Sequence, residues 1–160
     1  MRFHRVKIFC VALVLAVLAV GGPVRAADSK REVRAQWLVE AQPGDPWPSY
    51  WLVNKDHPEL RQEMFLAGPI ADDRPWISEV VAVDEERGIY LIVYYAGQPG
   101  TSEMVDVFYA LIYDARKKAL LGHFPYRRTS SRSDYSPEWV FERNRILVRD
   151  EGAETAVINY

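Results

Sequence analysis

The sequence predicts an all-β domain built from antiparallel β-hairpins. Apolar and aromatic residues gather in short runs that are separated by charged or Gly/Pro-rich breaks, which is the pattern of strands and turns. Similar turn segments also recur about every thirty residues along the chain. At 160 residues the chain is long enough for one domain with its own core, and we expect a single domain.

The first 26 residues have the features of a secretory signal peptide. Arg2, Arg5 and Lys7 precede an apolar run over 8–20, and Val24-Arg25-Ala26 places small residues at the −3 and −1 positions of a cleavage site. The apolar run has 13 residues, fewer than the roughly 20 that span a bilayer. We therefore predict export to a bacterial periplasm, cleavage near Ala26, a single domain over 27–160 and no stable membrane insertion after cleavage.

The predicted mature domain is acidic and lacks cysteine. Four of the 20 basic residues but none of the 22 acidic residues lie in the first 26, so cleavage moves the net charge from −2 to −6. This balance disfavours binding to a phosphate backbone, and nucleic acid is not an expected partner. The single cysteine, Cys10, lies within the apolar run, so disulfides would contribute nothing to the mature domain.

The strands are expected where the apolar runs lie. In chain order they are RAQWLVE (34–40), SEVVAV (78–83), IYLIVYYA (89–96), DVFYALIYD (106–114), WVF (139–141), RILVRD (145–150) and AVINY (156–160). Segment 106–114 is apolar on both faces, which predicts a strand that is buried on both sides. Segment 60–67 suits either a short helix or an edge strand. The terminal runs 34–40 and 156–160 could pair with each other and so protect two sheet edges.

Four segments share the form of a hairpin turn: 53–60, 83–90, 113–120 and 141–147, whose first residues are 30, 30 and 28 positions apart. In three of them Asn54, Asp84 or Asp114 follows the first apolar residue, and such side chains favour a turn by bonding the backbone two residues on. This spacing predicts four hairpin units of about 30 residues in a small propeller-like or sandwich-like assembly. Ordinary hairpins at regular intervals are the alternative.

Three connections are expected to converge at the other end of these hairpins: 67–75, 96–104 and 126–137. Binding residues are often placed on loops that a rigid scaffold holds. The third connection is the longest and the richest in arginine, serine and tyrosine, and arginine and tyrosine are favoured at interface hot spots. It supplies the main candidate partner-binding residues, Arg127, Arg128, Thr129, Ser130, Ser131, Arg132, Asp134 and Tyr135. The other two supply a secondary loop face, Asp72, Asp73, Arg74, Gln98, Thr101 and Ser102. A hydrated connector is the alternative interpretation.

No catalytic, metal or cofactor site is predicted. His57 and His123 are the two histidines of the predicted mature domain, and neither Ser130 nor Ser131 lies in a Gly-x-Ser-x-Gly nucleophile elbow. Metal-binding motifs such as His-Glu-x-x-His are missing from the sequence. A glycosidase with two carboxylates far apart in the chain stays open as an alternative.

The tryptophans suggest a second class of function. Trp37 and Trp139 lie in strand patterns and are expected in the core, whereas the Pro-rich segment GDPWPSYW (44–51) could expose Trp47 to a sugar. A carbohydrate- or envelope-ligand-binding module is therefore the alternative to a protein-binding module. A structural subunit of an envelope complex is a third hypothesis.

In outline, the export signal, the hairpin pattern and the segment RRTSSRS (127–133) resemble the periplasmic immunity proteins that are paired with cell-wall-degrading toxins of bacterial secretion systems. The resemblance concerns architecture. It implies a non-enzymatic inhibitor whose partner is a toxin or hydrolase, with Ser130 and Ser131 inserted into the partner's active site. A rigid loop would lower the entropy cost of such binding.

Overall fold

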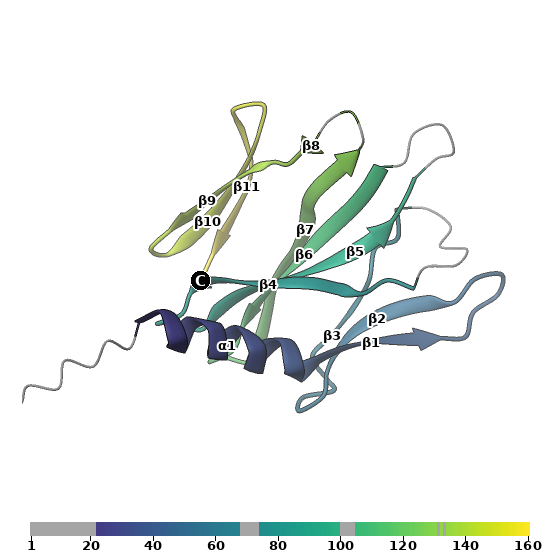
Figure 1. The fold of residues 1–160 in the computed structure, drawn as a ribbon, viewed down its shortest axis with the longest axis horizontal. Helices are drawn as coiled ribbons and strands as arrows, with labels where there is room; N and C mark the ends of the chain where they lie inside the picture. The colour runs from purple at the N-terminus through teal and green to yellow at the C-terminus, as the bar shows by residue number, and fades with distance from the viewer. Residues whose placement is uncertain (1–21, 68–73, 100–104, 131, 133) are drawn as a thin grey trace, which may run out of the picture.

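The computed structural model describes residues 22–67, 74–99, 105–130, 132 and 134–160. Within them the chain forms one helix and eleven strands, which are arranged in three antiparallel sheets (Figure 1). The elements are α1 (Gly22–Gln36), β1 (Trp37–Gln42), β2 (Ser49–Asn54), β3 (Arg61–Glu63), β4 (Ile77–Asp84), β5 (Ile89–Gly97), β6 (Val105–Asp114), β7 (Ala119–Ser130), β8 (Asp134–Tyr135), β9 (Glu138–Glu142), β10 (Arg145–Asp150) and β11 (Ala153–Asn159). The mostly β prediction is confirmed.

A five-stranded sheet in the order β4-β5-β6-β7-β8 forms the centre of the domain. It curls into a half-barrel, and bulges in its ladders, including those at Tyr126 and Leu121 of β7, increase the local twist. The sheet β1-β2-β3 lies on one side of it together with α1, and the sheet β11-β10-β9 lies on the other (Figure 1).

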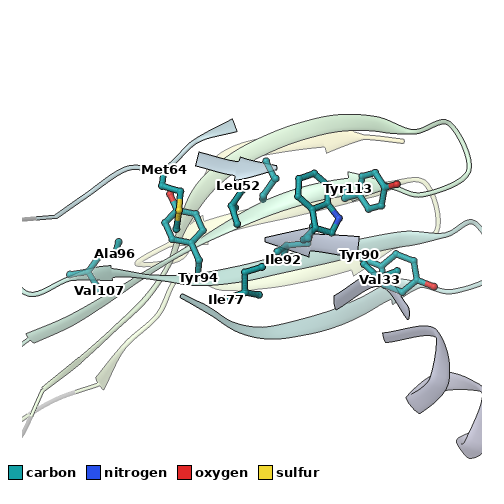
Figure 2. Packing of buried hydrophobic residues seen from close by; sticks show 12 residues of the cluster. Val33, Leu52, Met64, Ile77, Tyr90, Ile92, Tyr94, Ala96, Val107 and Tyr113 are labelled. Carbon is teal, nitrogen blue, oxygen red and sulfur yellow. The ribbon is translucent and has the colours of Figure 1, made fainter. Parts of the chain in front are cut away.

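The central strands are apolar on both faces because each face meets a different layer. Along β5, Tyr90, Ile92 and Tyr94 enter the core beneath β1–β3 (Figure 2), whereas Leu91 and Val93 enter the core beneath β9–β11. Strand β6 divides in the same way, which confirms the prediction that segment 106–114 is buried on both sides. Burial on two faces explains why these strands show continuous apolar runs instead of alternation.

The predicted hairpin turns are present at all four positions. They join β2 to β3, β4 to β5, β6 to β7 and β9 to β10. Asn54 Oδ1 accepts the backbone N–H groups of Asp56 and His57, and Asp114 Oδ1 accepts those of Arg116 and Lys117. The predicted bonding of Asn54 and Asp114 to the backbone two residues on is confirmed, and Asp84 Oδ1 bonds three residues on, to the N–H of Arg87.

Four equivalent repeat units and a propeller are not seen among the described residues. The β4–β5 and β6–β7 hairpins share one sheet, and the β2–β3 and β9–β10 hairpins belong to two others. Segment 60–67 contains the edge strand β3 and no helix, which resolves the two interpretations of that segment.

The two ends of the chain differ from expectation. Residues 34–36 belong to α1, and the terminal strands β1 and β11 pair with β2 and β10 in different sheets, so the expected pairing of 34–40 with 156–160 is wrong. Each terminal strand instead pairs with a close sequence neighbour, as short connections favour. Val33 of α1 is buried and Arg34 donates to the carbonyl of Ile77, so the helix packs along β4, an edge of the central sheet. Within the described residues, no helix has the length and apolar character needed to cross a membrane.

Candidate functional site

Segment 126–137 is a β-hairpin, and the expectation that it forms a loop without strands is wrong. Strand β7 continues to Ser130, which pairs with Val105 of β6. Arg128 and Thr129 then pair with Tyr135 and Asp134 of β8. Polar side chains fit here because β8 is short and lies at the sheet edge, where side chains reach solvent. The backbone of this hairpin is therefore held by pairing on both sides of β7.

The predicted partner-binding residues divide between the two strands and the turn of this hairpin. Arg128 and Tyr135 are exposed, with 41% of Tyr135 accessible to solvent, and Arg127, Thr129 and Ser130 are half-buried. The backbone N–H of Arg132 bonds the Ser130 hydroxyl oxygen at 3.2 Å within the turn. Asp134 is exposed on β8, and Ser131 lies outside the described residues.

Most of the secondary loop face cannot be placed. Asp72, Asp73, Thr101 and Ser102 lie outside the described residues. Arg74 is exposed, and Gln98 donates a hydrogen bond to Asp106 at 2.8 Å. The described ends of the three predicted connections do lie together, because Ala67 donates to the carbonyl of Ala96 and Val105 pairs with Ser130.

A cleft of about 340 Å³ lies beside the hairpin, between the central sheet and β10–β11. Its volume is at the lower end of the range of about 300–1,000 Å³ for ligand pockets. Apolar side chains from both sheets line it: Phe108, Phe124, Pro125, Pro137, Val148 and Ala156. Its polar lining comes from Tyr109, Arg127, Arg128, Tyr135, Asp150 and Thr155. The cleft thus combines an apolar interior with few polar groups.

The β-bulge at Tyr126 orients the arginines. Phe108 pairs with Arg127 and Tyr109 with Pro125, which leaves Tyr126 as the extra residue. Tyr126 packs with the core beneath β9–β11, and the guanidinium of Arg127 lies 4.4 Å from the centre of the Phe108 ring. A bulge re-aims neighbouring side chains in this way.

Arg127 is partly neutralised by an acid from the far edge of the sheet. Its Nη1 atom lies 3.3 Å from Glu79 Oε1 of β4. The contact is an ion pair without hydrogen-bond geometry. The Arg127 Nε and Glu79 Oε1 atoms are both buried without a hydrogen-bond partner among the described residues. Curling of the sheet brings β4 and β7 close enough for this contact. The pair could not be predicted from a local sequence pattern, because the two residues are far apart in the chain.

Tyr135 and Asp150 close one side of the cleft. The Tyr135 hydroxyl donates to Asp150 Oδ1, which connects β8 to β10. This hydrogen bond to a carboxylate raises the pKa of Tyr135, because loss of the phenol proton would set two negative groups together. Sequence inspection missed Asp150 and Thr155, because they lie in another sheet and approach the hairpin through tertiary packing alone.

A second hollow, of about 490 Å³, opens near His123 between β7 and residues 62–66. His123 Nε2 lies 2.6 Å from the hydroxyl of the buried Tyr94. The backbone N–H of Phe65 donates to the same hydroxyl at 2.8 Å. The expectation that His123 fills or caps the sheet is consistent with this placement. Within the described residues, no group of three His, Cys, Asp or Glu side chains could hold a metal ion.

The predicted positions of the tryptophans are largely confirmed. Trp37 is 1% exposed in the core, and Trp139 is half-buried against the core beneath β9–β11, where its Nε1 donates to the carbonyl of Tyr126. Trp47 is 69% exposed, whereas Trp51 is half-buried with Arg61 over its ring.

The chain has no significant match to a protein-family model, a curated protein or a solved structure. Function is therefore inferred from the site alone.

Proposed function

We propose that this is an exported protein-binding module that attaches to another protein through the β7–β8 hairpin and the adjacent cleft. One observation carries the proposal. Arg128 is exposed beside the exposed Tyr135 at an apolar cleft, and it has no ion-pair partner among the described residues. Arginine and tyrosine beside an apolar pocket form the usual centre of a protein interface.

The more specific form of the proposal is an inhibitor, or immunity protein, of a bacterial toxin or hydrolase in the periplasm. It is supported by the resemblance in outline and by the rigidity of the hairpin. Ladder pairs with Val105 and Asp106 hold Ser130 and Thr129 before any partner arrives, so little entropy would be lost on binding. The signal-like first 26 residues support export.

A binding role also suits the chemistry near the hairpin better than catalysis does. The Tyr94 hydroxyl accepts the Phe65 N–H and shares a second hydrogen bond with His123 Nε2. That nitrogen is therefore already hydrogen-bonded within the protein, whereas a general base needs a nitrogen that can reach the substrate.

The test compares inhibition of cell-wall hydrolases by the wild-type protein and by hairpin variants. We expect the wild type to inhibit at least one such enzyme with one-to-one stoichiometry and to co-purify with it. Arg128→Ala and Thr129→Ala should weaken the complex, whereas Arg143→Ala, an exposed residue at the β9–β10 turn, should not. Equal inhibition and capture by all variants would contradict a role for the hairpin.

Carbohydrate or envelope-ligand binding is the second candidate function, and the exposure of Trp47 favours it. Trp76 is also exposed, at 45%, although its ring stacks on Tyr95. Exposed indole rings can stack on sugars, so soluble peptidoglycan fragments should then quench tryptophan fluorescence. Loss of that binding in Trp47→Ala, with hairpin variants unaffected, would favour this candidate over the first.

A further inference from the structure

We propose that the cleft beside the β7–β8 hairpin binds an acidic segment of the partner protein. An apolar side chain of that segment enters the cleft, and a neighbouring aspartate or glutamate pairs with Arg128. This inference rests on the proposed function, because it names the chemistry that the same surface recognises.

The interior of the cleft selects an apolar group. Phe108 and Phe124 approach from the central sheet, and Val148 and Ala156 approach from the β10–β11 side. None of these side chains offers a hydrogen bond, so a polar group placed among them would lose its hydration without compensation. A cleft of about 340 Å³ has room for one large aromatic or aliphatic side chain.

The charged groups of the cleft lining have partners among the described residues, except Arg128. Asp150 accepts the Tyr135 hydroxyl, the Thr155 hydroxyl donates to the carbonyl of Val148, and Arg127 lies against Glu79. Arg128 is the cation that remains without an acid among the described residues. A guanidinium matches a carboxylate with two parallel N–H donors, so the missing ligand is a carboxylate.

The position of Arg128 fits the side-chain carboxylate of a segment that passes across the rim of the cleft. Arg128 is exposed, whereas the apolar groups line the interior. A segment that passes across the rim can direct one apolar side chain inward and the adjacent carboxylate toward Arg128.

Binding of three short peptides to the full chain tests this inference; the first two are capped at both ends. One peptide contains Phe followed by Asp, a second contains Phe followed by Asn, and a third ends in Phe with a free carboxylate. We expect the Phe-Asp peptide to bind about tenfold more tightly than the Phe-Asn peptide in NMR titrations at low salt, because a charge-assisted bond is lost in the second. Equal binding of these two peptides, or tighter binding of the free-carboxylate peptide, would overturn the inference.

Charge reversal supplies the second arm. Arg128→Glu should lose the preference for Asp and bind a Phe-Lys peptide more tightly than a Phe-Asp peptide, and the milder Arg128→Gln should bind Phe-Asp and Phe-Asn equally. Arg143→Ala should behave as the wild type does. A hydrolase captured through the hairpin but equally well by Arg128→Glu would contradict this inference and leave the proposed function standing. If the peptides bind with the expected charge dependence but no protein partner is captured, the inference about the cleft stands and the proposed function is contradicted.

Discussion

The hydroxyl of Tyr94 and Nε2 of His123 lie 2.6 Å apart and join the centre of β5 to β7 across the intervening β6. The Tyr94 oxygen also accepts the Phe65 N–H, and the direction of its hydrogen bond with His123 depends on which imidazole nitrogen carries the proton. Burial lowers the pKa of His123 and raises that of Tyr94. The Tyr94 hydroxyl therefore connects Phe65 to His123, and burial of the imidazole favours its neutral form.

This arrangement predicts a loss of stability in mild acid. The pKa of His123 in the folded state lies below its ordinary value of 6.5, so the unfolded state binds more protons as the pH falls. The free energy of unfolding should be highest above about pH 6.5 and should decrease as the pH falls through the folded pKa. Urea unfolding from about pH 7.5 to about pH 5 measures this slope.

His123→Gln should flatten the acid-side slope. The amide oxygen of glutamine can accept the Tyr94 proton but does not titrate, so this substitution removes the proton linkage and keeps a hydrogen bond. His57→Gln is the matched control, because His57 lies at the β2–β3 turn, 3.3 Å from Glu59 and outside the core. An unchanged slope in His123→Gln would contradict the role assigned to the Tyr94–His123 pair.

The Arg127–Glu79 pair is expected to stabilise the fold mainly through packing. The two side chains are 38% and 40% exposed and their contact lacks hydrogen-bond geometry. Exposed ion pairs of this kind contribute about 0.2–1 kcal/mol. Arg127→Met retains an apolar stem over Phe108 and should therefore cost less than Arg127→Ala. The measurement is the free energy of unfolding in guanidinium chloride.

A double-mutant cycle with Glu79→Gln isolates the electrostatic part of that pair. We expect a coupling energy below about 1 kcal/mol between Arg127→Met and Glu79→Gln. A larger coupling, or equal costs for Arg127→Ala and Arg127→Met, would show that charge dominates the contact.

Local chemistry made the strands and turns predictable from the sequence. Asn54, Asp84 and Asp114 bond backbone groups only two or three residues away, so their turns could be predicted without knowledge of the sheets. The continuous apolar runs of β5 and β6 reflect burial on two faces, which is also a property of the strand itself.

Long-range pairing made the rest unpredictable. The segment around Arg128 has the composition of a loop, and it forms a strand because β6 and β8 pair with it from both sides. The acid that meets Arg127 comes from β4, and Asp150 comes from a different sheet. Four hairpins at similar spacing did not determine how those hairpins would be shared among the sheets.

Asn54 is expected to be the most sensitive of the turn residues. It is fully buried, and its Oδ1 accepts two backbone N–H groups of the β2–β3 turn. Asn54→Ala removes the acceptor of both N–H groups and should lower the free energy of unfolding by about 1–3 kcal/mol. Asp114→Asn is the matched control, because it keeps the acceptor for Arg116 and Lys117 and loses only an ion pair with an exposed lysine. A loss as large in Asp114→Asn as in Asn54→Ala would show that charge matters more than the acceptor.

Gly122 provides a test of the packing that shapes the cleft. A Cβ atom at this position would lie 2.3 Å from Cε2 of Phe124, whose ring lines the cleft. Gly122→Ala should displace that ring and cost about 1–3 kcal/mol of stability, as overpacking does. Because the obstacle is a side chain, Phe124→Leu should relieve part of the clash, and the double variant should be more stable than the sum of the two single losses predicts.

A glycine substitution far from the cleft separates this effect from general loss of stability. Gly88 has a φ of 75°, which an alanine adopts only with strain, and it lies in the β4–β5 turn. Gly88→Ala should therefore lower the free energy of unfolding by about 1–2 kcal/mol while the resonances of cleft residues keep their positions in NMR spectra. Gly122→Ala should move those resonances as well. Strictly additive losses in the Gly122→Ala, Phe124→Leu cycle would instead mean that the alanine is accommodated by the backbone and that the Phe124 ring stays in place.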